Sequence, residues 1–107
     1  LGTFEQIVLL AVLRQGEDAY GRAILREIEE ALSGSRTIAA GAVYATLDRL
    51  ETKGLVASKL RAGTPERGGR KRRFYRVTAG GSRALEDARS TLESLWNSIR
   101  WPIEVRS

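Results

Sequence analysis

Three patterns in a fixed order between residues 40 and 77 constrain the fold more than any other feature of this sequence. The first is a helical pattern, because apolar side chains recur at spacings of four and three, and Gly54 follows, the residue type favoured directly after a helix C-terminus. The second and third are short strand patterns at 55–60 and 72–77. The loop between them is rich in glycine and proline, which do not continue a strand. We therefore expect a helix that leads into a β-hairpin.

Two more helices are expected before this unit. The first opens with a capping-box pattern at Thr3–Gln6, with Thr3 as the N-cap, and is apolar almost all round from Ile7 to Leu13. A helix without a polar face must be buried on more than one side. The second runs from about Tyr20 to Leu32 and the third from about Ala40 to Lys53, each with one apolar stripe. Three helices followed by a β-hairpin predict a mainly α, winged helix-turn-helix fold with a two-stranded wing.

The positive charge of the chain is concentrated in the expected wing. The formal net charge is +5, but residues 59–76 alone carry eight basic side chains against one acid, Glu66, a net charge of +7. The rest of the chain therefore sums to −2. A basic block on a slightly acidic body is typical of a protein that binds a polyanion such as double-stranded DNA. A charge run can also be no more than a solvated face, and its position in a winged helix is what favours DNA.

The composition argues against catalysis. The chain has no cysteine and no histidine, which removes disulfides, Cys/His zinc sites and Ser-His-Asp relays. We therefore expect a binding protein and not an enzyme, with no metal site and no cofactor. No apolar run approaches the roughly 18–20 residues that span a bilayer, and no secretory signal is evident, which predicts a cytoplasmic protein without a membrane partner. Because the first residue is Leu1, a few residues are expected to precede it.

A fourth helix is expected from the N-cap Thr78 to about Trp96 or Ile99. Its apolar residues recur at spacings of three and four, a seam of two heptads that is too short to hold a coiled coil alone. Packing on the chain's own core would account for the seam, but together with the apolar first helix it favours a homodimer. The residues expected at the dimer interface are Phe4, Val8, Leu85, Leu92, Leu95, Trp96 and Ile99. We expect a winged-helix DNA-binding domain at 1–78 and a C-terminal dimerisation helix and tail at 79–107.

The ordered motifs of the chain resemble those of the PadR-like transcriptional regulators over nearly its whole length. The residues that carry the resemblance are Ala19-Tyr20-Gly21, Gly41–Glu51, Gly54-Leu55-Val56, Gly68-Gly69-Arg70, and Phe74–Thr78 leading into Gly81. The resemblance implies a homodimeric repressor whose third helix enters the major groove while each wing reaches the adjacent backbone or minor groove. It places the chain in the compact group of that family, whose C-terminal helix crosses to the other subunit. One departure is that Ala39 and Ala40 stand where the family often has a serine or threonine N-cap for the third helix, so Thr37 could serve instead.

The residues expected to contact DNA fall into three groups. On the third helix they are Ala42, Tyr44, Ala45, Thr46, Arg49 and Lys53. Small side chains with a few long donors suit a helix that lies against base edges, with alanine methyls near thymine methyls and Arg49 on guanine or a phosphate. Tyr20 and Arg22 are expected to meet a phosphate at the start of the second helix. On the wing, the expected contacts to the DNA backbone are Arg67, Arg70, Lys71 and Arg72.

Alternatives remain open at this point. Tyr44 could be a half-buried core tyrosine, and Arg49 could pair with Asp48, Glu51 or a wing residue. The winged helix could serve RNA or protein contact, although Tyr44 is the only ring on the proposed face that could stack on a base. The chain could also be a small-molecule sensor in which Trp96 lines a pocket for a hydrophobic planar effector at the dimer interface, as in some compact relatives. Simple interface packing would account for Trp96 equally well.

Overall fold

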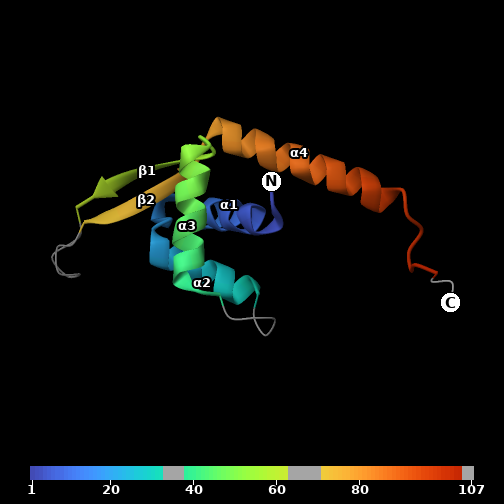
Figure 1. The fold of residues 1–107 in the computed structure, drawn as a ribbon, viewed down its shortest axis with the longest axis horizontal. Helices are drawn as coiled ribbons and strands as arrows, with labels where there is room; N and C mark the ends of the chain where they lie inside the picture. Colours follow the sequence, from blue (N-terminus) through green and yellow to red (C-terminus); the bar gives the residue numbers. More distant parts are fainter. Residues whose placement is uncertain (33–37, 63–70, 105–107) are drawn as a thin grey trace.

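The computed structural model describes residues 1–32, 38–62 and 71–104. The elements, in chain order, are α1 (Thr3–Gln15), the 3₁₀ turn η1 (Gly16–Asp18), α2 (Gly21–Ala31), α3 (Ala40–Thr52), β1 (Val56–Arg61), β2 (Arg72–Val77) and α4 (Ala79–Asn97). The two strands pair antiparallel, from Val56 opposite Val77 to Arg61 opposite Arg72. This architecture confirms the mainly α winged helix-turn-helix with a C-terminal helix. Figure 1 shows α1, α2 and α3 gathered at the centre, with the hairpin extending to one side and α4 to the other.

The core lies where α1, α2, α3 and the base of the hairpin meet. The stripe predicted for α3 is confirmed, because Val43, Leu47 and Leu50 are completely buried. The other large, fully or nearly fully buried side chains are Val8, Leu9, Val12, Ile24, Ile28 and Val56. Each such aliphatic side chain contributes about 1.5–3 kcal/mol by leaving water. The core therefore holds α3 by one buried stripe and leaves the rest of the helix surface, including Ala42, Ala45 and Arg49, open to solvent.

The hairpin is joined to the helices at two places. Gly54 has a φ of 76°, the left-handed conformation that favours glycine, and it turns the chain from α3 into β1 as predicted. On the other edge, the backbone N–H of Tyr75 donates to the carbonyl of Ala19 at 2.8 Å, and Tyr20 forms an isolated bridge with Phe74. The start of α2 therefore lies directly beside β2.

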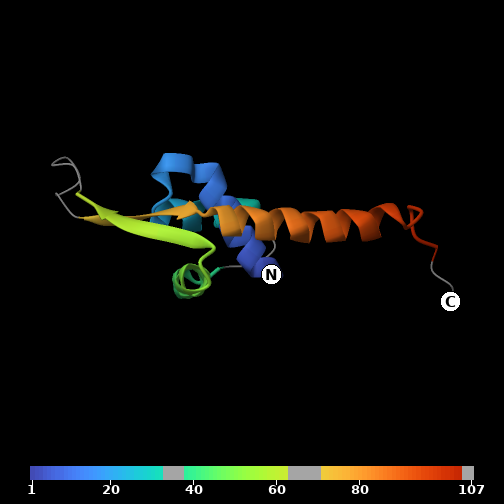
Figure 2. The same ribbon diagram turned by 90° about the horizontal axis from the view of Figure 1, so that it is seen from above.

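The long helix α4 leaves the body as an arm (Figures 1 and 2). Its N-cap is Thr78, as predicted: the side-chain oxygen accepts from the Gly81 N–H at 3.1 Å, and the hydroxyl donates to the Gly54 carbonyl at 2.6 Å. Gly81 is buried against the chain at Leu55, whereas every residue from Arg89 to Glu104 is exposed. No helix within the described ranges combines the length and apolarity needed to cross a membrane.

Several predicted boundaries differ from the structure by a residue. The N-cap of α1 is Gly2 and not Thr3, because the Glu5 carboxylate accepts from the Gly2 N–H at 3.1 Å and closes the capping box one residue early. The first strand begins at Val56 instead of 55. The N-cap of α3 is Ala39, which has no side chain able to cap, and Thr37 lies outside the described residues. These shifts leave the order and packing of the elements unchanged.

Candidate nucleic-acid interface

The solvent-facing side of α3 carries most of the residues predicted there. Ala42, Ala45 and Arg49 are exposed, and Tyr44 is 39% exposed. Thr46 is 1% exposed, so the prediction that it faces DNA is wrong. It lies three residues after Val43 and four before Leu50, and this spacing places it on their buried face of the helix.

The two long cations of α3 are held in different ways. The Arg49 guanidinium donates through Nη2 to Thr46 Oγ1 at 3.0 Å, a neutral partner, and no carboxylate lies within ion-pair distance of it among the described residues. The alternative that Arg49 pairs with Asp48 or Glu51 is therefore not what the structure contains. Lys53 forms an ion pair with Glu5 of α1 at 2.7 Å, and the hydrogen bond from Lys53, followed by that from the Gly2 N–H, lowers the pKa of the Glu5 carboxyl. The Lys53 ammonium group therefore already has a carboxylate partner within the protein.

The ring of Tyr44, from α3, packs at the start of α2, where Tyr20 is the N-cap. The Tyr44 ring packs over Gly21 so closely that an added Cβ would overlap it, which supports the half-buried packing role for Tyr44. The Tyr20 ring meets Phe74 edge-on at 5.7 Å between centroids. The side chain of Arg22, expected to act with Tyr20, is exposed. The N-cap of α2, Tyr20, makes no side-chain cap hydrogen bond, so the first N–H groups of this helix have no capping side chain from it.

One face of the hairpin carries cations stacked on aromatic rings. The guanidinium of Arg72 lies 4.5 Å from the Tyr20 centroid, and that of Arg61 lies 4.4 Å from the Phe74 centroid. Arg72 is half-buried, and its Nη1 is buried without a hydrogen-bond partner among the described residues. Lys71 is exposed. The other two predicted wing contacts, Arg67 and Arg70, lie outside the described residues.

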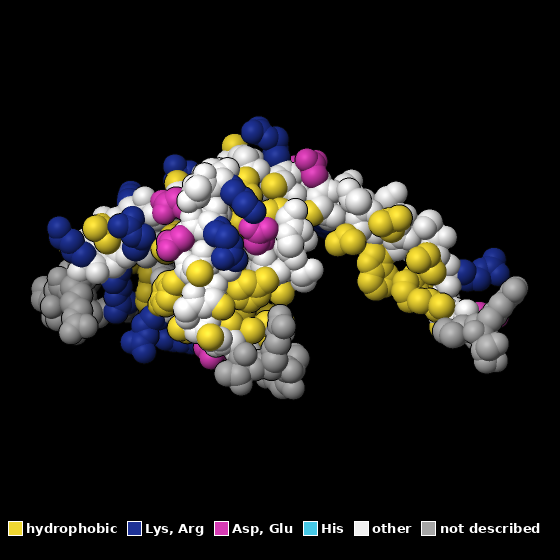
Figure 3. Space-filling model, in the orientation of Figure 1, with side chains coloured by type: hydrophobic (Ala, Val, Ile, Leu, Met, Phe, Trp, Pro, Cys, Tyr) yellow, Lys and Arg dark blue, Asp and Glu magenta, His cyan; other side chains and the backbone are white. Residues whose placement is uncertain are grey.

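The opposite face of the hairpin, toward α3, holds an arginine that the sequence reasoning did not select. Ser58 donates to the Glu51 carboxylate at 2.6 Å and accepts from Arg73 Nη1 at 3.0 Å, which links the end of α3 to both strands. Tyr75 lies on the same face, and burial is the main reason that the pKa of its phenol is raised. The strand alternation that placed Tyr75 and Val77 inward could have pointed to Arg73 as well. Figure 3 shows Lys and Arg side chains gathered over the hairpin beside α3, with Asp and Glu side chains between them.

The expected dimer residues divide between covered and uncovered positions. Leu92, Leu95, Trp96 and Ile99 are 47–59% exposed, and hydrophobic side chains gather along the α4 arm in Figure 3. Val8 is completely buried in the chain's own core, so its prediction as an interface residue is wrong, while Phe4 and Leu85 are half-buried against that core. On α1, Leu10 and Leu13 are instead the uncovered residues, at 50% and 51% exposure. They were missed because a helix that is apolar all round does not reveal which side its own core takes.

A groove of about 590 Å³ separates α1 from α4, and Leu10, Leu13, Leu92 and Trp96 are among the side chains that line it. The Trp96 ring stacks on Trp101 with 4.8 Å between centroids. The Trp101 indole N–H also donates to the Trp96 carbonyl at 3.2 Å. The indole of Trp101 therefore already covers one face of the Trp96 ring within the chain.

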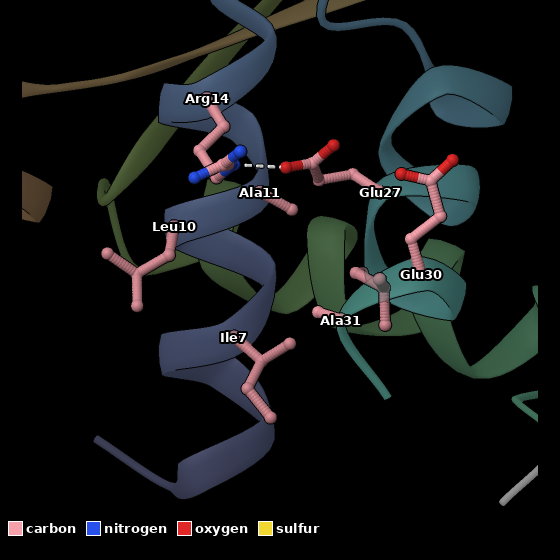
Figure 4. A pocket seen from close by; sticks show the side chains of 8 residues that line it. Ile7, Leu10, Ala11, Arg14, Glu27, Glu30 and Ala31 are labelled. Carbon is pink, nitrogen blue, oxygen red and sulfur yellow. Dashed lines mark hydrogen bonds and ion pairs between the residues drawn. The ribbon is translucent and has the colours of Figure 1, made fainter. Parts of the chain in front are cut away.

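A second groove, of about 470 Å³, lies between α1 and α2 (Figure 4). Ile7, Leu10, Ala11 and Ala31 form its apolar part, and the ion pair between Arg14 and Glu27 bridges the two helices at one end. Leu10 lines both grooves, so α1 is flanked by uncovered apolar surface on two sides. Neither groove includes a residue of α3 or of the hairpin.

Comparison with known proteins relates the whole arrangement to one group of regulators. The profile of the transcriptional regulator PadR-like family matches residues 9–87. The transcriptional regulator Rv3488 of Mycobacterium tuberculosis is 43% identical over 62 residues, which cover 58% of this chain and 54% of that relative, about half its length. A PadR-like transcriptional regulator from Bacillus cereus has a similar structure, with a TM-score of 0.71, 24% identity, and coverage of 91% of this chain and 87% of that one. Bacillus subtilis PadR, solved in complex with operator DNA, has a TM-score of 0.62 at 20% identity, covering 95% of this chain and 52% of that one.

Proposed function

The chain belongs to the PadR-like family of transcriptional regulators, and we propose that it acts as a DNA-binding repressor that holds a two-fold symmetric operator as a homodimer. As a member of this family it is a regulator and not an enzyme. The observation that carries the proposal is the pairing of two surfaces on one chain. An open α3 face stands beside a basic hairpin, and part of the apolar surface of α1 and α4 remains uncovered. The first surface suits DNA. The second, made of Leu10 and Leu13 on α1 and the exposed apolar residues of α4, suits a second copy of the chain.

In this proposal α3 supplies sequence discrimination. Its exposed Ala42 and Ala45 offer methyl groups of the size that contacts thymine, and Arg49 offers a guanidinium that suits guanine or a phosphate. Tyr44 of α3 and, at the start of α2, Tyr20 and Arg22 are proposed phosphate contacts. The ion pair with Glu5 makes Lys53 the weakest of the proposed α3 contacts.

The wing supplies affinity more than sequence preference, because phosphate contacts position a protein without reading bases. Its proposed contacts are Arg67, Arg70, Lys71 and Arg72. Replacing Arg70 and Lys71 together should weaken binding to operator and unrelated DNA alike, and should flatten the plot of log affinity against log salt by about two units. A loss confined to the operator with an unchanged slope would contradict this division of roles.

A footprint on the DNA immediately upstream of the chain's own gene tests the proposal as a whole. We expect a two-fold symmetric footprint, with half-sites separated by about one helical turn or a multiple of it. An asymmetric footprint, or equal protection of unrelated DNA and of duplex RNA, would contradict it and favour one of the other uses of a winged helix.

Dimerisation is proposed to proceed through the uncovered seam of α4 and the outer side of α1. Leu92→Glu places a charge in this apolar surface and should shift the protein from dimer to monomer in sedimentation velocity. Ser90→Glu is the matched control, since Ser90 is exposed two residues away and outside the seam. If both variants remain dimeric, the interface lies elsewhere.

A hydrophobic planar effector is a second proposal, supported by the groove beside Trp96. Such a ligand would reach the groove from the interface side and alter operator affinity. Titration of intrinsic tryptophan fluorescence with planar cationic dyes tests this, with Trp101→Phe to leave Trp96 as the only reporter. A signal that does not respond in either protein would remove the proposal.

A further inference from the structure

We propose that Arg73 is an additional contact to the DNA backbone, and that Ser58 and Glu51 are positioning residues that hold its guanidinium beside α3. The inference rests on the proposed DNA-binding function. It adds a contact that lies between the two already proposed, those of α3 and those of the outer wing.

The register of the hairpin places Arg73 on the sheet face toward α3. Ser58 pairs with Tyr75 and Leu60 pairs with Arg73, so these four side chains share the sheet face that looks toward α3. The Ser58 hydroxyl lies between two charged groups, donating to Glu51 Oε2 at 2.6 Å and accepting from Arg73 Nη1 at 3.0 Å. A single hydroxyl thus fixes a strand arginine relative to the last turn of α3.

The absence of a direct ion pair distinguishes Arg73 from three other basic residues of the described chain. Arg14, Lys53 and Arg89 each contact a carboxylate directly and are neutralised by it. Arg73 has no carboxylate within 4.0 Å among the described residues, and its one hydrogen bond there is to a neutral hydroxyl. A guanidinium carries five N–H donors, so most of them remain available on an exposed side chain.

An oriented guanidinium with free donors and no direct ion pair matches a phosphate group, which accepts two parallel hydrogen bonds. Ser58 also keeps Arg73 and Glu51 from pairing directly, because its oxygen occupies the position between them. Without that hydroxyl, the two opposite charges would be free to form an ion pair, and the Arg73 guanidinium would no longer be available to contact a phosphate. This makes Ser58 a spacer as well as an anchor.

The location of Arg73 fits a backbone contact. It projects from the hairpin face next to α3, so a helix lying in the major groove would bring the flanking phosphates toward it. The proposed outer contacts Arg72 and Lys71 lie one and two residues before it in the chain. Arg76 is an exposed arginine of the same strand nearer the base of the hairpin, beside Leu13 of α1 and away from α3, which makes it the matched control.

The test measures the salt dependence of binding for wild type, Arg73→Gln, Arg76→Gln, Ser58→Ala and Ser58→Thr. The probes are duplexes that the wild-type protein selects from a randomised pool, together with one unselected duplex. Arg73→Gln should lower the slope of log affinity against log salt by about one, so that raising salt from 50 to 200 mM costs about three- to four-fold less affinity than in wild type. Arg76→Gln should keep the wild-type slope.

Ser58→Ala should reproduce the slope of Arg73→Gln, because Arg73 is released to pair with Glu51, and Ser58→Thr should restore the wild-type slope. Adding Glu51→Gln to Ser58→Ala should also restore it, since no carboxylate is left to capture Arg73. A purely structural role for Ser58 would lower the melting temperature without moving the slope. If Arg73→Gln keeps the wild-type slope, the inference is overturned while the proposed function stands. If the wild-type protein binds neither duplex, both fall.

Discussion

The joint between the winged-helix body and the α4 arm gives the sharpest prediction from this structure. Gly81, in the first turn of α4, is buried where the helix crosses the start of the hairpin. A Cβ at this position would overlap the Leu55 carbonyl oxygen and lie 2.8 Å from Val77 Cγ1. The first of these neighbours is backbone, so it cannot turn away as a side chain would. Gly81→Ala must therefore displace α4 from the hairpin.

The cost follows from three contributions. Forcing an extra carbon into a packed contact costs about 1–3 kcal/mol. Displacement of the helix start also endangers the cap, in which Gly81 N–H donates to Thr78 Oγ1 at 3.1 Å, and loss of a cap costs about 1 kcal/mol. Replacing glycine by alanine in a helix returns about 0.5–1 kcal/mol. The net expectation is a loss of about 1–3.5 kcal/mol in the free energy of unfolding.

Gly80→Ala is the matched control. A Cβ there would lie 3.5 Å from the Gly54 carbonyl oxygen, an ordinary contact, so the variant should gain about 0.5–1 kcal/mol from helix propensity alone. Urea denaturation followed by circular dichroism compares the two variants with wild type. The reasoning is refuted if Gly81→Ala proves as stable as Gly80→Ala, because the contact at Leu55 would then not be tight.

Three further substitutions test other parts of the structure. The pKa of Glu5 is lowered by Lys53, so their ion pair stabilises the fold above the ordinary pKa of the carboxyl and is lost as pH falls through the lowered one. Glu5→Gln should cost about 0.2–1 kcal/mol in urea denaturation at neutral pH and nothing in strong acid, whereas an equal cost at both would contradict the pairing. Gly21→Ala should turn the Tyr44 ring away and weaken DNA binding in gel shifts more than it lowers the melting temperature. Gly41→Ala, with open space around it, should raise the melting temperature yet weaken DNA binding, and unchanged binding would argue that α3 does not approach DNA there.

Much of the fold was predictable from the sequence because local signals agreed with one another. The stripe of α3, the glycine after it and the N-cap Thr78 each rest on interactions within a few residues of the chain. Such interactions are largely independent of what the rest of the molecule does. Helix and strand order could therefore be read directly, with boundary errors of about one residue.

The residues that were misplaced depend on packing between elements. Thr46 is expected outward because a helix against base edges favours small side chains, yet its spacing from Leu50 puts it on the buried face, where its hydroxyl accepts from Arg49. Val8 was assigned to a dimer interface because α1 is apolar all round, which cannot distinguish the side facing its own core from the side left open. In both cases residue type or sequence pattern alone predicts the wrong surroundings for the side chain, because packing between helices determines which residues are buried.

Arg73 illustrates why the candidate site was harder to predict than the fold. Strand alternation assigns it to the same face as Tyr75, and an arginine on an inward face reads as an inconsistency in the pattern. The pattern does not show that the strand extends beyond the core. Val77 and Tyr75 pack against apolar side chains, whereas Arg73, two residues further out on the same face, contacts Ser58 and, through it, Glu51. Period-two alternation specifies a direction but not what lies in that direction. An inward charge near a strand tip is therefore a reason to look for a polar partner on the neighbouring element, because only such a partner makes that position favourable for a charge.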